Sequence, residues 1–138
     1  MEASFPRNVA SLDSIFDQIS GFVAANHIDD ESAFAVRLAV EELFVNMVKY
    51  NPGIGGDIHI KIARTGDRLI ASITDPGGGR FDVTKVPAYD GNLPLEARRP
   101  GGLGIHLTRR VMDEIRYTYE NGRGTVTLTR NLAGSRRR

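Results

Sequence analysis

The chain has 138 residues, of which 41% are hydrophobic and 25% are charged. This length and composition are typical of one soluble globular domain, and they exclude a chain that is disordered throughout. The sequence contains no cysteine, which excludes disulfides, thiolate zinc sites and cysteine nucleophiles. No apolar run approaches the about 20 residues that cross a bilayer, and residues 1–8 lack the features of a signal peptide, so we expect a cytoplasmic protein that does not enter a membrane.

The charge balance argues against nucleic acid as a direct partner. The 18 basic residues include the terminal Arg136, Arg137 and Arg138, and without these the remaining 15 face 17 acidic residues. The body of the chain is therefore slightly acidic, whereas a general nucleic-acid binder needs an excess of basic residues. The arginine triplet matches no motif, and we assign no function to it.

The first part of the sequence predicts a short strand and two helices. Residues 4–8 favour an opening strand. Apolar residues then recur at steps of three and four over 9–25, which predicts an amphipathic helix. A second helix is expected over about 31–50, with Asp29 or Asp30 as its N-cap and an Asn-Pro-Gly sequence after its end.

The middle of the sequence changes to a period of two. Alternating apolar residues over 58–63 and 69–75, with a turn at 65–67, predict two antiparallel neighbouring strands. A segment rich in glycine and proline, 76–102, follows with little periodicity. Because a long segment of this kind inside a domain is usually functional, we expect a nucleotide lid or binding loop there.

The last part of the sequence predicts a third helix over 103–114 and a closing hairpin with strands at 115–120 and 125–129. The order of elements indicates an α+β fold, a two-layer sandwich in which three helices cover one face of a mostly antiparallel sheet. We expect a single domain over 1–138, with a tail at 132–138.

Glu42 and Asn46 form the first motif. They are four residues apart on the predicted second helix, so their side chains lie on the same face, one turn after the other. That face is otherwise apolar, and burying a carboxylate there is costly unless the group has a use. The structural alternative is that Glu42 lies at the rim of the helix and Asn46 bonds to a nearby backbone group.

The second motif is Asp75 followed by Pro76, Gly77, Gly78 and Gly79 at the end of a predicted strand. The strand holds the carboxylate in place, and the glycines let the backbone approach a flat ligand closely. A buried carboxylate accepts a hydrogen bond from an exocyclic amine, which favours adenine over guanine. The alternative is an ordinary tight turn that the aspartate closes through its own backbone.

The third motif is a glycine-rich entry into the third helix, with Arg98 and Arg99 before Gly102, Leu103 and Gly104. The N-terminus of a helix offers free N–H groups and the positive end of the helix dipole, which suit phosphate. The spacing matches neither a Walker loop nor a dinucleotide fingerprint. A linker with a helix cap is the structural alternative.

The ordered set of these three motifs resembles the nucleotide-binding signature of the ATPase superfamily shared by DNA gyrase, histidine kinases and the MutL mismatch-repair proteins, known as the Bergerat fold. Within that superfamily, the stretches 41–46 and 101–107 resemble the serine/threonine-protein kinases that act as anti-sigma factors in bacterial stress response and sporulation. The resemblance covers residues 4–129 approximately. It implies a histidine kinase-like ATPase domain of a bacterial protein.

The resemblance also implies a role for each motif. Asn46 would bind Mg²⁺ through its side-chain oxygen, and Glu42 would accept or orient the proton of an incoming serine or threonine hydroxyl. Asp75 would accept a hydrogen bond from the adenine amine, and Gly77 and Gly79 would form the floor of the pocket. The ATP phosphates would lie against backbone and arginine ligands: Arg99 or its neighbour Arg98, Gly102, Leu103 and Gly104.

The leading hypothesis is a kinase that uses ATP and Mg²⁺ to phosphorylate a STAS-domain anti-anti-sigma factor and that sequesters a sigma factor or similar regulatory protein. The resemblance also implies a homodimer formed through the sheet. Tyr50, where many relatives have histidine, and the distance of the arginines from the glycines leave a second function open, an ATP-dependent protein-binding module without kinase activity. A detached histidine-kinase domain is disfavoured, since no helix with a phospho-accepting histidine precedes the motifs.

Overall fold

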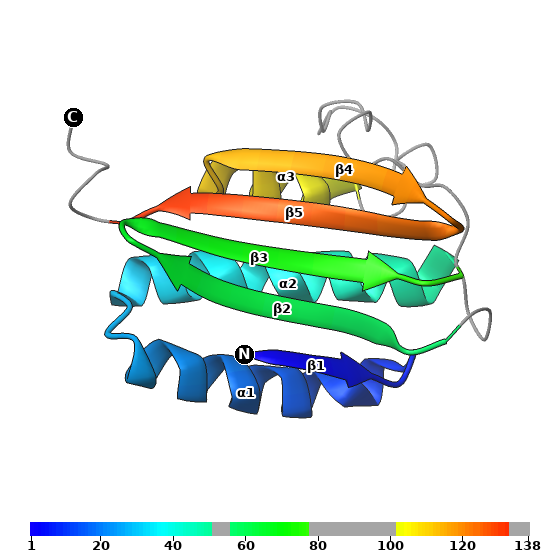
Figure 1. Cartoon of the computed structure of the whole chain (residues 1–138), viewed down its shortest axis with the longest axis horizontal. Helices are drawn as coiled ribbons and strands as arrows, with labels where there is room; N and C mark the ends of the chain where they lie inside the picture. The colour runs from blue at the N-terminus through cyan, green and yellow to red at the C-terminus, as the bar shows by residue number, and fades with distance from the viewer. Residues whose placement is uncertain (51–55, 78–101, 133–138) are drawn as a thin grey trace.

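The computed structural model describes residues 1–50, 56–77 and 102–132, with the backbone alone at residues 50 and 102–106. Within these ranges the chain forms a two-layer α+β sandwich (Figure 1). In chain order the elements are β1 (Glu2–Phe5), the 3-10 turn η1 (Val9–Ser11), α1 (Leu12–Ala25), α2 (Asp30–Tyr50), β2 (Ile58–Thr65), β3 (Arg68–Asp75), α3 (Gly102–Val111), β4 (Glu114–Glu120) and β5 (Arg123–Asn131).

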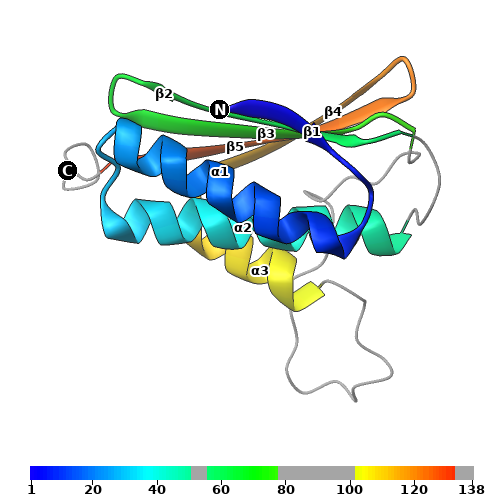
Figure 2. The same cartoon turned by 90° about the horizontal axis from the view of Figure 1, so that it is seen from below.

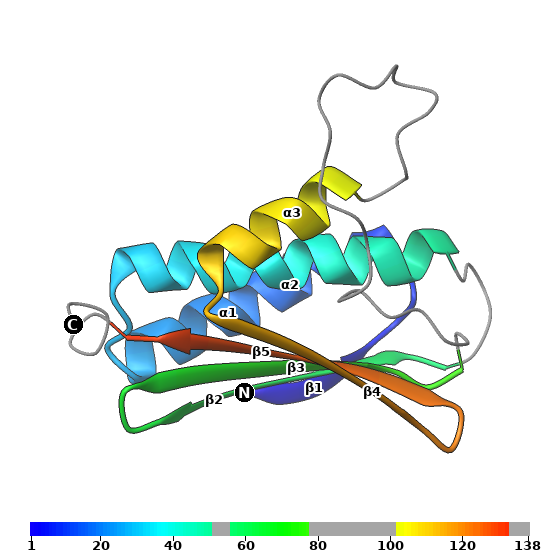
Figure 3. The same ribbon diagram turned by 90° about the horizontal axis from the view of Figure 1, so that it is seen from above.

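The five described strands form one sheet in the order β1-β2-β3-β5-β4, and every neighbouring pair is antiparallel. All three described helices cover the same face of this sheet, as Figures 2 and 3 show from opposite sides. The α+β sandwich expected from the sequence is therefore confirmed. The expected lid, 76–102, and tail, 132–138, lie outside the described residues except at 76–77, 102 and 132.

The core lies between the sheet and the helices. Alternating strand residues point inward, and α2 crosses the middle of the layer, so side chains from both sides are fully buried. Burying one such side chain stabilises the fold by about 1.5–3 kcal/mol. The largest fully buried side chains are Phe44, Ile15, Leu43, Ile58, Ile60, Ile62, Leu69, Ile73, Leu128, Val36 and Val40.

Two local signals act as the sequence predicts. The carboxylate of Asp29 accepts the backbone N–H of Ser32 at 2.9 Å, so Asp29 is the N-cap of α2. At the hairpin between β4 and β5, Asn121 and Gly122 have φ values of 53° and 77°. Two left-handed residues at this place are typical of a type I′ turn, whose twist matches the strands.

The boundaries of several elements differ from the predicted ones. β1 ends at Phe5, because Pro6 has no N–H to continue the ladder. Val9 is 52% exposed and lies in the 3-10 turn, so it is not the first apolar position of α1. α3 ends at Val111, and Glu114 is the first residue of β4. None of the described helices has both the length and the apolar character needed to cross a bilayer.

Candidate functional site

The candidate site lies at the end of the sheet where β3 finishes. Asp75 is the last residue of β3, and α2, which carries Glu42 and Asn46, packs against both β3 and α3. The first turn of α3 lies toward this end of the molecule (Figure 3). The fold therefore brings elements that carry all three sequence motifs to one region.

Asn46 is buried inside the C-terminal half of α2. Asn46 is only 3% exposed, and its Nδ2 group has no hydrogen-bond partner among the described residues. A buried donor without a partner costs about 1–3 kcal/mol, so such groups are rare unless something else satisfies them. The Nδ2 group of Asn46 is therefore suited to donate to a ligand with oxygen atoms, such as phosphate. The side-chain oxygen of Asn46 is suited to bind a hard cation such as Mg²⁺.

Glu42 lies one helical turn before Asn46 and is partly buried. Burial raises the pKa of its carboxyl above the ordinary value of 4.5, and the neighbouring Glu41 raises it further, while Lys49 acts in the opposite direction. A raised pKa makes a carboxylate a better proton acceptor near neutral pH. Glu42 therefore has the environment expected of a general base.

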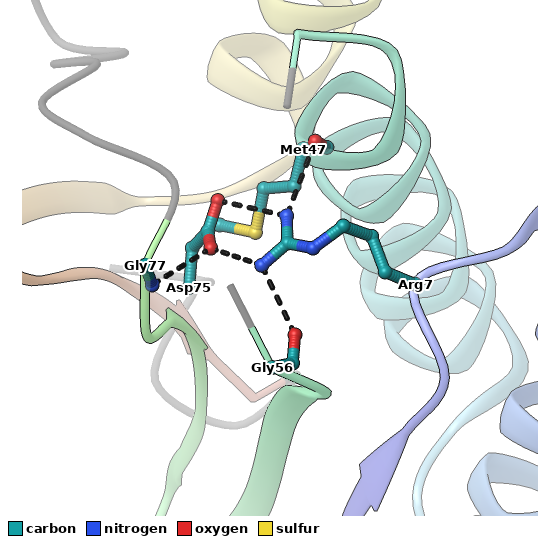
Figure 4. Close-up of polar contacts among 5 residues, drawn as sticks. All are labelled: Arg7, Met47, Gly56, Asp75 and Gly77. Atoms are coloured by element: carbon teal, nitrogen blue, oxygen red, sulfur yellow. Dashed lines mark hydrogen bonds and ion pairs between the residues drawn. The ribbon is translucent and has the colours of Figure 1, made fainter. Parts of the chain in front are cut away.

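Asp75 has the same orientation as Leu69, Ala71 and Ile73, so its side chain points toward the helices and is 7% exposed. Its carboxylate is bound by Arg7, with Nη1 donating to Oδ2 at 3.2 Å and Nη2 to Oδ1 at 2.5 Å (Figure 4). The backbone N–H of Gly77 is 3.4 Å from Oδ1. The carboxylate is thus held in one orientation at the end of its strand.

Arg7 is the site residue that the sequence motifs did not include. It lies in the connection between β1 and η1, and its side chain is 5% exposed. No periodicity or spacing marks it, because its partner Asp75 is 68 residues further along the chain. The only local sign is a charged residue immediately after Pro6 and before Asn8, whose side chain caps the 3-10 turn.

The glycine motifs are only partly described. Gly102, Leu103 and Gly104 form the first turn of α3, which has 10 residues. The first four N–H groups of a helix have no partner within the helix, so this turn is suited to bind phosphate as the sequence predicts. Gly79 and the arginines Arg98 and Arg99 lie outside the described residues, so their predicted roles stay predictions.

These residues fit a nucleotide with a bound magnesium ion. Asp75 offers an acceptor for an amine, Asn46 offers an amide with an unsatisfied donor, and α3 offers a helix N-terminus. Mg²⁺ bound beside ATP would neutralise phosphate charge, and Asn46 is the residue that would hold it. Glu42 is then the neighbouring side chain available to accept a proton.

Comparison with known protein families gives one match over most of the chain. The family described as the histidine kinase-like ATPase domain matches residues 5–130. The serine-protein kinase RsbW of Staphylococcus aureus (strain MSSA476) is 33% identical over 118 residues, which are 78% of this chain and 69% of that protein. The sensor histidine kinase YxdK of Bacillus subtilis (strain 168) is 23% identical over 120 residues, and the match spans only 37% of its length.

A solved structure agrees with the family match. The crystal structure of the SiaB-SiaC complex from Pseudomonas aeruginosa contains a chain that superposes with a TM-score of 0.65 at 17% identity, over 94% of this chain and 87% of that chain. At this identity the likeness concerns the fold, and it agrees with the helices and sheet in Figure 1.

Proposed function

Because the chain belongs to the histidine kinase-like ATPase domain family, we propose that it is an ATP-dependent serine/threonine-protein kinase of the anti-sigma type. Its substrate would be a STAS-domain anti-anti-sigma factor in the cytoplasm of a bacterium. The similarity to the RsbW serine-protein kinase of Staphylococcus aureus supports this choice within the family. The resemblance of the stretches 41–46 and 101–107 to the anti-sigma kinases supports the same choice.

The observation that carries the kinase proposal is the position of Glu42 beside Asn46. A module that only binds nucleotide needs Asn46 and Asp75, but it has no use for a partly buried carboxylate with a raised pKa. A kinase needs that group, because the incoming hydroxyl must lose its proton. The kinase is therefore preferred to the binding module.

Each side chain has one step in the proposed reaction. Asp75 accepts a hydrogen bond from the adenine amine and so orients the base, while the first turn of α3 binds the phosphates. The substrate hydroxyl oxygen attacks the γ-phosphorus as the bond to the bridging oxygen breaks, which leaves ADP. The hydroxyl proton passes to Glu42. Mg²⁺ held by Asn46 would supply charge neutralisation when bound, and positioning supplies most of the remaining rate enhancement.

The proposal includes protein partners as well as a substrate. The unmodified antagonist and a sigma factor or similar regulator would compete for the protein, and direct nucleic-acid or membrane contact is not part of the function. The solved chain with the same fold comes from a complex of SiaB with SiaC, which agrees with a protein-binding role.

A homodimer through the sheet would use the face opposite the helices. No described helix covers this face (Figure 2), and hydroxyl side chains from β3 and β5 lie on it, with Thr74 and Thr125 in contact at 3.0 Å. Sedimentation of the purified protein at several concentrations tests this part of the proposal. A monomer at all concentrations would remove it.

Incubation with Mg-ATP and the STAS-domain proteins encoded near the gene tests the kinase. We expect phosphate on one serine or threonine of one such protein, mapped by mass spectrometry, and no phosphate when that residue is replaced by alanine. If every candidate stays unphosphorylated while ATP is bound, the kinase proposal fails and the binding module replaces it.

A further inference from the structure

We propose that Arg7 is a positioning residue for nucleobase selection. It orients the Asp75 carboxylate, which accepts a hydrogen bond from the adenine amine. This inference rests on the proposed function, since it takes Asp75 as the group that contacts the base. It adds a residue outside the three nucleotide motifs to the site. It also connects the segment after β1 to the choice between adenine and guanine.

The geometry of the pair supports positioning. Both terminal nitrogens of Arg7 contact the Asp75 carboxylate, one on each oxygen, and the two side chains are 5% and 7% exposed. A planar guanidinium that binds both oxygens restricts rotation of the carboxylate, which a single lysine nitrogen does less well. Because an ionised carboxylate has about four acceptor positions, contact with Arg7 is compatible with contact to a base.

Arg7 is itself anchored by two further elements. Its Nη1 lies 3.5 Å from the carbonyl oxygen of Met47 in α2, and its Nη2 donates to the carbonyl oxygen of Gly56 at 3.1 Å. Figure 4 shows the guanidinium between these groups and Asp75. Since Met47 follows Asn46 directly, one side chain connects the helix that carries the proposed magnesium ligand to the strand that carries the base acceptor.

The backbone that carries Arg7 is held before any ligand binds. The carbonyl oxygen of Pro6 accepts the N–H of Asn8 at 2.7 Å and the hydroxyl of Ser11 at 2.8 Å. Phe5, the last residue of β1, is buried in the core. The guanidinium is therefore preorganised, and little conformational freedom remains to be lost when a nucleotide binds.

Orientation of Asp75 matters for selectivity because adenine and guanine present different groups at C6, the position that Asp75 is proposed to contact. Adenine presents an amine there, which donates to a carboxylate, whereas guanine presents a carbonyl oxygen, which a carboxylate repels. If Arg7 serves stability alone, its loss lowers the unfolding temperature but leaves the ratio of ATP to GTP affinity unchanged. If it positions Asp75, its loss also lowers that ratio.

The test is a double-mutant cycle measured by calorimetric titration with Mg-ATP and Mg-GTP. The variants are Arg7→Met, Arg7→Lys, Asp75→Asn and the double variant, each checked for folding by circular dichroism. We expect Arg7→Met to weaken ATP binding roughly tenfold with little change for GTP, as expected when a hydrogen bond to a charged group is lost. Arg7→Lys should give an intermediate ratio.

The double variant keeps the test decisive if Arg7→Met alone does not fold. Removing both charges avoids an unpaired buried carboxylate, so the double variant should be more stable than Arg7→Met. We expect it to bind ATP within about twofold of Asp75→Asn, because residues that act through one another show non-additive effects. A double variant that binds ten times more weakly than Asp75→Asn would overturn the inference.

Arg64→Met is the matched control. Arg64 donates to the carbonyl oxygens of Gly66 and Asn26, it has no carboxylate partner among the described residues, and it lies near the opposite end of the sheet from Asp75. The Arg64→Met variant should bind Mg-ATP and Mg-GTP as tightly as the parent does.

Two further results overturn the inference while the proposed function stands. A folded Arg7→Met that keeps the parent ratio of ATP to GTP affinity would assign Arg7 to stability alone. Tighter ATP binding by that variant would mean that Arg7 competes with the base for Asp75. A parent protein that binds no ATP, or an Asp75→Asn variant that binds it as well as the parent, would instead overturn the proposed site.

Discussion

Two arginine side chains are almost completely buried at opposite ends of the sheet, and they have different partners. Arg130 is 3% exposed and donates to the hydroxyl of Ser32 at 2.9 Å and to the carbonyl oxygen of Val111 at 2.6 Å. Its carboxylate neighbour, Glu31, is 3.4 Å away and 84% exposed. Arg7, by contrast, binds a carboxylate that is buried as deeply as itself.

This difference agrees with a structural role for Arg130 and with the functional role proposed for Arg7. Two neutral acceptors, with the exposed Glu31 carboxylate at the surface, connect α2, α3 and β5 around Arg130. A buried ion pair costs several kcal/mol of desolvation per ion, so it is an inefficient way to hold a fold. At the other end, Arg7 and Asn46 also carry buried donors without partners among the described residues. Unsatisfied groups and buried charge together are expected where a ligand completes the site.

The largest expected effect at the site end is on catalysis. Glu42→Ala should lower phosphoryl transfer at least about 100-fold, since general bases contribute roughly 10²–10⁴-fold, while ATP affinity stays within about twofold. Transfer to the STAS-domain partner and calorimetric ATP binding are measured in parallel. Glu31→Ala, an exposed glutamate at the other end of α2, is the control and should behave as the parent. Unchanged transfer in Glu42→Ala would exclude a catalytic role for this residue.

The largest expected effect at the other end is on stability. Arg130→Met should lower the free energy of unfolding by about 2–3 kcal/mol, because it removes hydrogen bonds made by a charged group and leaves the Val111 carbonyl without that donor. Urea titration measures the change. ATP affinity of the folded variant should equal that of the parent. A folded Arg130→Met that has lost ATP binding would contradict the separation of the two ends.

Base recognition should depend on the charge at the end of β3. Asp75→Asn should weaken ATP binding at least about tenfold, because a hydrogen bond to a charged group contributes roughly 1.5–3 kcal/mol. Asp67→Asn, an exposed aspartate in the turn before β3, should bind ATP as the parent does. Equal affinity of Asp75→Asn and the parent would remove Asp75 from the site.

The smallest expected effect concerns the pH dependence of stability. The pKa of Glu42 is raised by burial and by Glu41, so the folded chain holds this proton to higher pH than the unfolded chain. Stability therefore falls as pH rises from the ordinary value of 4.5 through the raised value, and the cost remains above it. Glu42→Gln removes that cost and should raise the unfolding temperature at neutral pH by no more than about 4 °C.

The rise should be absent at pH values below 4.5, where glutamate is protonated in both states. Thermal unfolding of Glu42→Gln and of the parent at several pH values measures this difference. A Glu42→Gln variant that is less stable than the parent at neutral pH would contradict a stability cost from the partly buried Glu42 carboxylate.

Periodicity was sufficient to predict the helices and the antiparallel sheet. Alternation over 58–63 and 69–75 marks the inward residues of β2 and β3, because strand side chains alternate between faces. Boundaries were less predictable. Glu114 continues a helical pattern, yet it pairs with Thr129 across β4 and β5. Local periodicity does not predict such a pairing between distant residues.

The candidate site was predictable only where its chemistry is local. Glu42 and Asn46 share a helix face, and Asp75 ends a strand with glycine after it, so these local patterns, together with the resemblance to the ATPase superfamily, predict them as site residues. Arg7 and Arg130 gain their roles from partners 68 and 98 residues away, respectively. A side chain whose function depends on such distant contacts has no signature in its own neighbourhood.

The most direct test of the account is a backbone amide NMR titration of the parent protein with Mg-ATP. We predict saturable shifts below about 1 mM, the upper end of common substrate affinities, at Arg7, Met47, Asp75, Gly77 and the first turn of α3. The backbone amide resonances of Ser32 and Arg130 should not shift. Shifts centred on Arg130, or no shifts at that concentration, would contradict a nucleotide site at the Asp75 end of the sheet.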